Sequence, residues 1–334
     1  AWPYMAPRLR LLLSRRFPAL RTAADRIVRA LPRLAPRAVL VDEDTTEFKR
    51  LLVLLCGRRG VPSVVAQHGV PLKPLGFVPM RAARMAVWGD ASRRRLAAWG
   101  VPASRMRVTG CPRYDAYRPP ESAGAAARRA AVRGALGLAP EGPLAVIAAA
   151  QFPRQNIERF ESTLSNPWEF RRIVSAAMAL ADAMPRVGWV LKLHAGGARP
   201  EYFARLGDAV RARPNLRVVS RFDLRRLLEA ADLVVASYSS MVLEAALLAV
   251  PVVVANLSPY PDDDPYVPTG GVVAVRSEAD LAAAARRVRE GARRDGDGEE
   301  ARRRMLDLLV RGADGRATEC VADLVREVAG GEGG

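Results

Sequence analysis

The stretch DLVVASYSSMVLEAALLAVPVVVANL, residues 232–257, decides the fold of this chain. Residues 233–236 form a short apolar run rich in β-branched side chains, the pattern of a strand buried on both faces. Polar residues interrupt the run at 237–240, an apolar helix over 241–249 follows, and Pro251 ends that helix before a second strand at 252–254. A strand that feeds a helix and then another strand indicates a parallel sheet, with the serine turn at its carboxyl edge.

The serine turn allows two interpretations. Ser239 or Ser240 is a good N-cap for the helix, and capping alone accounts for both hydroxyls. Free backbone N–H groups at a helix start also attract anions, and two hydroxyls there suit a phosphate or diphosphate. The pattern itself leaves both interpretations open.

Strands alternate with helices along the rest of the chain, in two sets separated by a Pro-containing linker over 117–124. This alternation predicts an α/β protein with two Rossmann-like parallel-sheet domains, residues 1–118 and 119–334. The predicted strands are 38–41, 63–66, 85–88 and 107–109, then 144–150, 188–193, 216–219, 233–236, 252–254 and 272–275. The predicted helices are 48–58, 92–99, 126–136, 168–184, 201–213, 224–231, 241–249, 279–290, 302–310 and 318–328.

Composition limits the classes of partner. The net charge is +17, and the basic residues are nearly all arginine, which fits nucleic acid, an anionic membrane surface or acidic substrates. The arginines are scattered through helices and aromatic residues are few, which argues against nucleic acid. A general bias towards arginine and alanine explains the charge equally well. Three widely spaced cysteines favour a reducing compartment, so the expected location is cytoplasmic.

Residues 1–36 are basic and apolar, and Pro18 and Pro32 are expected to break their helical stretches. The stretch lacks the apolar core and cleavage site of a signal peptide. It fits a peripheral contact with the inner face of an anionic membrane, and it fits a surface helix of the first domain.

Both histidines, His68 and His194, directly follow predicted buried strands, one in each domain. The carboxyl edges of two such domains are expected to face each other across a cleft, where imidazole can exchange protons with a hydroxyl or bind a phosphate. Lys192 lies two residues before His194, so both point to one side of an extended strand. Asp42, Glu43 and Asp44 follow the first strand of the chain and are alternative proton acceptors.

Several common motifs are absent from the sequence: HExxH, paired CxxC, EF-hand loops, GxGxxG, GxxxxGK[ST] and GxSxG. The run Asp262-Asp263-Asp264 could bind a metal ion, but an exposed acidic turn is the expected structure. Neither a metal nor another cofactor is therefore expected.

Five segments carry a family resemblance: QHG at 67–69, AVWGD at 86–90, RVTGCPRYD at 107–115, LKLH at 191–194 and the stretch 230–254. In their order and spacing they resemble GT-B fold glycosyltransferases of bacterial capsule and surface-polysaccharide assembly, and the related CDP-glycerol glycerophosphotransferases. The resemblance spans about residues 38–290. It implies a nucleotide-sugar donor and a polysaccharide or glycolipid acceptor.

The resemblance also implies roles for individual residues. His194, Ser239 and Ser240 would hold the donor phosphate, and Glu244 would lie on the nucleotide side. Lys192 and Gln151, both at strand ends of the second domain, are assigned to the donor as well. His68 would be the catalytic base, with Asp42, Glu43 and Asp44 as alternatives.

Two features depart from the family pattern. His194 is followed by alanine where the family usually has proline, and residues 1–37 do not clearly supply the two or three strands expected before residue 38. The first domain is therefore expected to be reduced, or to have a further N-terminal portion. Two other functions stay open: an enzyme like UDP-N-acetylglucosamine 2-epimerase, or a non-catalytic binding module of the same fold.

Overall fold

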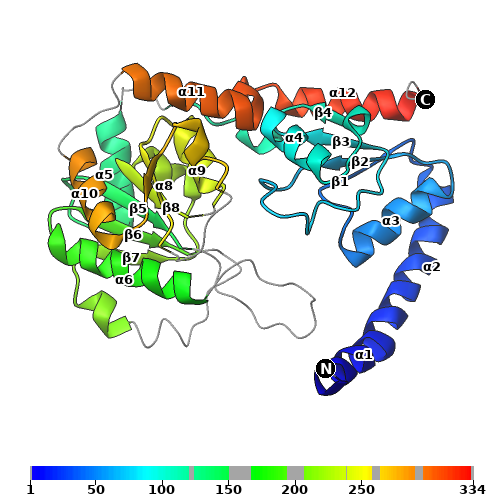
Figure 1. Cartoon of the computed structure of the whole chain (residues 1–334), viewed down its shortest axis with the longest axis horizontal. Coiled ribbons are helices and arrows are strands. Elements are labelled where there is room, and N and C mark those ends of the chain that lie inside the picture. The colour runs from blue at the N-terminus through cyan, green and yellow to red at the C-terminus, as the bar shows by residue number, and fades with distance from the viewer. Residues whose placement is uncertain are drawn as a thin grey trace. The chain divides into compact units, whose positions relative to one another are not determined.

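The computed structural model describes residues 2–119, 124–149, 167–193, 207–237, 239–257, 264–289 and 296–331. Within these ranges the chain forms two compact units, each built on a parallel sheet (Figure 1). The first unit comprises residues up to 116 together with those from 307 onward, and the second comprises the residues between. The predicted α/β class with two parallel-sheet domains is confirmed.

The sheet of the first unit has the strand order β1-β2-β3-β4, and every pair is parallel. Its elements are β1 (Val39–Val41), α3 (Glu47–Gly57), β2 (Ser63–Ala66), β3 (Arg84–Val87), α4 (Asp90–Ala98) and β4 (Met106–Val108). Each crossover steps in the same direction, and right-handed crossovers of that kind put their helices on one face. Side chains of α3 and α4 accordingly share one core with Val65, Met85 and Val87 of the sheet.

The opposite face of this sheet is covered by the last helix, α12 (Ala317–Gly330). Val64 and Ala86, which alternate with the residues of the first core, pack against Val321 and Leu324 of α12. Without α12 this apolar face would lie open to water. The boundary expected from the sequence assigns residues 307–334 to the second domain, whereas the structure groups them with the first unit.

The second sheet has the order β10-β9-β8-β5-β6-β7, again with parallel pairs. Its strands are β5 (Leu144–Ala148), β6 (Gly188–Lys192), β7 (Leu216–Val219), β8 (Leu233–Ala236), β9 (Val252–Ala255) and β10 (Val273–Val275). The chain builds outward from β5 to β7, then returns to the other side of β5 with β8. The direction of winding therefore reverses between β5 and β8, and ligands bind at such switch points in open α/β sheets.

Helices cover both faces of the second sheet (Figure 1). α6 and α10 share the large core on one face, while α9 packs on β8 and β9 from the other. The helices are α5 (Ala125–Ala135), α6 (Pro167–Ala183), α8 (Leu224–Glu229), α9 (Met241–Leu247), α10 (Glu278–Arg289) and α11 (Gly296–Val310). Of the helix predicted over 201–213, residues 207–213 are described; 207–211 are helical, and the helix ends there, two residues before the predicted end.

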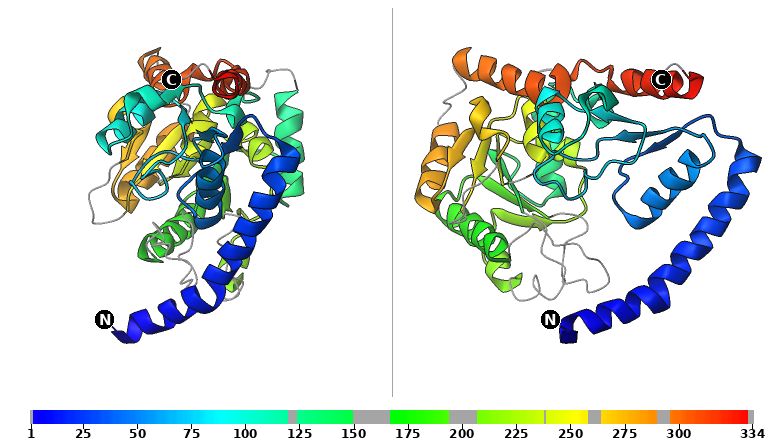
Figure 2. Two further views of the ribbon diagram at one scale, coloured as in Figure 1. Left: turned by 90° about the vertical axis from the view of Figure 1, so that its right-hand side faces the viewer. Right: turned by 45° about the vertical axis from the view of Figure 1, so that its right-hand side comes forward.

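The prediction that prolines break the N-terminal helices is wrong. α1 (Trp2–Leu11), a π-helical turn over Leu12–Arg16 and α2 (Phe17–Leu34) follow one another without interruption, as both views in Figure 2 show. Pro18 lies in the first turn of α2, just after the wide π-helical turn in which Phe17 N–H donates to Leu12 O. Pro32 lies inside α2 near its end, where it removes the hydrogen bond that its N–H would donate to Val28 O, but the helix still continues to Leu34.

Candidate functional site

Gln67 anchors the turn that follows β2. Its buried side chain accepts the N–H of Trp88 at 2.8 Å and donates to Gly69 O at 2.8 Å and to Ser92 Oγ at 3.0 Å. Trp88 Nε1 in turn donates to Gln67 O at 2.8 Å. The motifs QHG and AVWGD are thus tied together by a hydrogen-bonded network, which fixes the backbone on both sides of His68. The sequence alone predicts no role for Gln67, although it belongs to the QHG segment that carries the family resemblance.

His68 is exposed at the carboxyl edge of the first sheet and is oriented from two sides. Its ring stacks on Phe77 with centroids 4.8 Å apart and planes 12° apart. Nδ1 lies 3.2 Å from Asp42 O. A carbonyl oxygen can only accept, so this hydrogen bond places the proton of the neutral ring on Nδ1 and the lone pair on Nε2. Nε2 is then the atom able to take a proton.

The three acidic residues after β1 have different environments. Lys49 Nζ lies 2.7 Å from Asp42 and 3.0 Å from Glu43. Burial alone would raise the pKa of Asp42, but the hydrogen bond and charge of Lys49 outweigh it and hold that pKa below its ordinary value. The ionised form is therefore favoured in the folded state, and its contribution to stability is lost as pH falls through the lowered pKa.

Asp44 is buried, unlike its two neighbours. Its Oδ2 accepts the backbone N–H groups of Arg81 at 2.5 Å and of Ala82 at 2.7 Å. These bonds tie the end of β1 to the turn before β3. This oxygen of Asp44 therefore has a structural role, because it holds the turn before β3 in place.

The third motif, RVTGCPRYD, meets the C-terminal segment within the first unit. Both carboxylate oxygens of Asp115 accept backbone N–H groups at the start of α12, from Ala317 at 2.9 Å and Thr318 at 2.7 Å. Gly110 has φ +82°, and a Cβ there would lie 3.0 Å from Ala317 Cβ. The motif therefore docks α12 onto the sheet.

In the second unit the serine turn lies at the switch point, directly after β8, whose Ala236 pairs with Ala148 of β5. Ser239 Oγ accepts the N–H of Met241 at 3.2 Å, and Ser240 occupies the N-cap position without a side-chain capping bond. One hydroxyl is thus used by the helix, and the half-buried hydroxyl of Ser240 is not used for capping. Capping therefore accounts for the hydroxyl of Ser239 and does not account for that of Ser240.

Tyr266 stabilises the serine turn through a hydrogen bond. Its buried hydroxyl donates to Ser239 O at 3.1 Å. Burial, with smaller contributions from the charges of Asp264 and Glu244, raises the pKa of Tyr266 far above its ordinary value, so the phenol stays a donor. The sequence offered only a weak signal for this role, since Tyr266 is one of two tyrosines in a Pro-rich loop.

For Asp264, the expectation of an exposed acidic turn is wrong. It is buried, and its Oδ1 accepts the N–H groups of Tyr266 at 2.7 Å and Val267 at 3.0 Å. The carboxylate thereby caps the short 3₁₀ turn Val267–Thr269. Asp262 and Asp263 lie outside the described residues.

The other residues assigned to the donor differ in what the structure describes. Lys192, the last residue of β6, is buried and donates to Leu193 O at 3.1 Å and Ser220 O at 2.9 Å, and burial lowers its pKa. Glu244 is buried in α9, near enough to Tyr266 to affect its pKa. His194 and Gln151 lie outside the described residues. Within the described ranges, no cluster of three His, Cys, Asp or Glu side chains could hold a metal ion.

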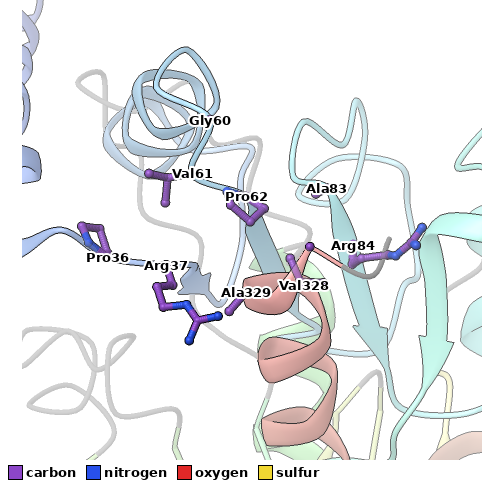
Figure 3. Close-up of a pocket in the computed structure, with 10 residues that line it drawn as sticks. Pro36, Arg37, Gly60, Val61, Pro62, Ala83, Arg84, Val328 and Ala329 are labelled. Atoms are coloured by element: carbon purple, nitrogen blue, oxygen red, sulfur yellow. The ribbon is translucent and has the colours of Figure 1, made fainter. Parts of the chain in front are cut away.

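A cavity of about 490 Å³ lies at the other edge of the first sheet (Figure 3). It opens where β1, β2 and β3 begin, whereas His68 follows the end of β2. Arg37 and Arg84 line the cavity, but their side chains extend in different directions and do not converge on one point. This cavity therefore does not include His68.

Removing the Tyr266 hydroxyl should loosen the serine turn. For Tyr266→Phe we expect the free energy of unfolding to fall by about 1–2 kcal/mol, because Ser239 O loses a buried donor. Amide exchange should speed up at Val242 and Leu243, whose N–H groups bond back to the serine turn. Hydrogen exchange by mass spectrometry, with the strands of the first unit as internal control, tests this. Unchanged exchange at both amides would show that Tyr266 does not hold the turn.

No family model and no curated protein matches the chain. Solved structures do resemble it. UDP-GlcNAc 2-epimerase from Neisseria meningitidis, bound to UDP-GlcNAc, is 14% identical, with 92% of this chain and 81% of that chain covered and a TM-score of 0.62. HepE from Anabaena in complex with UDP-glucose is 15% identical, with 90% and 82% covered and a TM-score of 0.57.

The wall teichoic acid polymerase TagF is also similar, at 14% identity, with 89% of this chain and 74% of that chain covered and a TM-score of 0.54. At these identities the likeness concerns the fold. The structures share two Rossmann-like parallel-sheet domains of the GT-B type, and this chain has that fold.

Proposed function

We propose that this protein transfers a sugar or a polyol phosphate from a nucleotide-activated donor to a surface-polysaccharide or glycolipid acceptor. The observation that carries the proposal is the orientation of His68. Its Nδ1–H is held by Asp42 O, so Nε2 is ready to accept a proton at the carboxyl edge of the sheet. A base with a fixed tautomer suits deprotonation of an acceptor hydroxyl.

The donor side is assigned to the serine turn. The Ser240 hydroxyl, with His194, would donate hydrogen bonds to the donor phosphate. As the acceptor oxygen bonds to the donor, its proton passes to His68 Nε2, and the bond to the nucleotide phosphate breaks. The nucleotide leaves with the bonding electrons, and the donors at the serine turn stabilise its added charge. Glu244, Lys192 and Gln151 complete the proposed donor side.

The surroundings of the carboxylates favour transfer over epimerisation. An epimerase of this fold needs further acid and base carboxylates around the sugar. In the first unit Asp44 is committed to backbone N–H groups, while Asp42 and Glu43 are paired with Lys49. Among His68, Asp42, Glu43 and Asp44, this leaves His68 as the proposed base.

Nucleotide binding gives the direct test. Calorimetry with CMP, CDP and UDP should show binding of at least one, and Ser240→Ala and His194→Ala should each weaken it by about 1–3 kcal/mol. Ser277→Ala removes a serine hydroxyl that bonds at the start of α10 and should change nothing. Affinity for the phosphate-free nucleosides should be the same in all variants. Equal nucleotide affinity in wild type and both site variants would remove the phosphate assignment.

Product analysis separates the candidate reactions. Incubation with CDP-glycerol or UDP-sugars and an acceptor should release nucleotide and extend the acceptor. Conversion of UDP-GlcNAc to its C2 epimer without transfer would support the epimerase instead. Nucleotide binding without any turnover would support a binding module.

A further inference from the structure

The N-terminal helices carry an apolar ladder that nothing in the described chain covers. Met5, Leu9, Leu13 and Phe17 recur every four residues along α1, the π-helical turn and the start of α2. Each is between 44% and 58% exposed. Over residues 5–34 a single side chain, that of Leu31 near the contact of α2 with α3, is buried. The rod therefore has an apolar surface without a partner among the described residues.

α2 has two sharply different faces. At 100° per residue, all its charged residues fall on one side of the helix. That side carries Arg21, Asp25, Arg26, Arg29 and Arg33. The other side carries Phe17, Leu20, Ala24, Ile27, Val28, Leu31 and Leu34.

The charge of the whole rod is strongly positive. Between residues 2 and 34 the chain has eight arginines, and Asp25 is the one acidic residue. No helix in the described parts of the chain is long and apolar enough to cross a membrane. A cationic helix with a separate apolar face instead matches the helices that lie in the plane of a membrane interface.

We propose that the α1–α2 rod binds an anionic lipid surface, with the apolar ladder inserted and the arginines at the headgroups. Two other partners fit less well. A second copy of this chain would cover the ladder but would bring two arginine-rich rods together. A nucleic acid would meet the arginines but leave the ladder in water. Anionic lipid satisfies both faces, independently of the reaction proposed above.

Vesicle flotation of the full chain tests the proposal. The protein should float with phosphatidylglycerol–phosphatidylcholine vesicles and less with pure phosphatidylcholine. Binding should weaken as added salt shortens the screening length from about 30 Å at 0.01 M to about 10 Å at 0.1 M. Equal binding to both kinds of vesicle, or binding to neither, would overturn the proposal.

A matched pair of variants separates insertion from simple attraction. Phe17→Glu and Thr22→Glu both add one negative charge at exposed positions, but Phe17 belongs to the ladder and Thr22 to the charged side. Thr22→Glu should weaken vesicle binding by about fivefold, as expected for one charge near the surface. Phe17→Glu should weaken it roughly 50-fold or more, because the inserted ring is lost as well.

Two outcomes would contradict insertion of the ladder. Equal losses of vesicle binding in Phe17→Glu and Thr22→Glu would show that the added charge alone weakens binding. A wild-type dimer in sedimentation experiments that Phe17→Glu converts to monomer would assign the ladder to a second copy of the chain.

Discussion

Replacing His68 with alanine should lower turnover by a factor of about 10² to 10⁴, the usual loss for a general base. Nucleotide affinity should stay nearly unchanged, because His68 belongs to the first unit and the proposed phosphate donors to the second. The substitution removes the imidazole that carries the proposed base atom, Nε2. Steady-state kinetics with calorimetry on the same preparation give both quantities.

The alternative for His68 is a packing role, since its ring stacks on Phe77 and bonds to Asp42 O. In that case His68→Ala should lower the melting temperature and leave turnover per folded molecule unchanged. That result would move the base to Asp42 or Glu43, because Asp44 Oδ2 already accepts two backbone N–H groups. Asp42→Asn and Glu43→Gln would then be the variants that lose turnover.

The strands were predictable because each is a short, continuous apolar run between polar or glycine-containing turns. Predicted strand ends at 63–66, 216–219 and 233–236 agree with the structure. The covering of the first sheet by α12 was not predictable in this way. Its contact with Val64 and Ala86 joins residues about 250 positions apart in sequence, and no local pattern encodes such a pairing.

The candidate site was predictable only for residues whose position follows from the order of neighbouring strands and turns in the sequence. The serine turn and His68 follow strand ends, and parallel strands bring such ends to one edge. What orients these residues comes from elsewhere in the chain. Tyr266 reaches Ser239 O from 27 residues away, and Asp42 O meets His68 from 26 residues away. Asp44 is held by hydrogen bonds from the turn at Arg81 and Ala82, and the loop before that turn has no sequence pattern that predicts this contact.

Gly89→Ala is expected to be among the most destabilising single substitutions in the first unit. An ideal Cβ at Gly89 would lie 2.4 Å from Leu308 O and 2.6 Å from Leu309 C. Both atoms belong to the backbone of the last turn of α11, so they cannot move aside as a flexible side chain could. We expect the free energy of unfolding to fall by about 3 kcal/mol or more.

Gly57→Ala is the matched control, because Gly57 lies in the same unit at the end of α3 and its Cβ would meet nothing within 4 Å. That variant should be as stable as wild type or slightly more so, since alanine favours a helix over glycine. Denaturant unfolding of the three proteins measures the difference.

If Gly89→Ala and Gly57→Ala unfold at the same denaturant concentration, the segment at Leu308 is not packed against the turn after β3. If Gly89→Ala alone is destabilised, the glycine of AVWGD is needed for the packing of the last turn of α11 against the turn after β3. That motif would then have two tasks, since Trp88 beside this glycine holds Gln67 and the turn that carries His68.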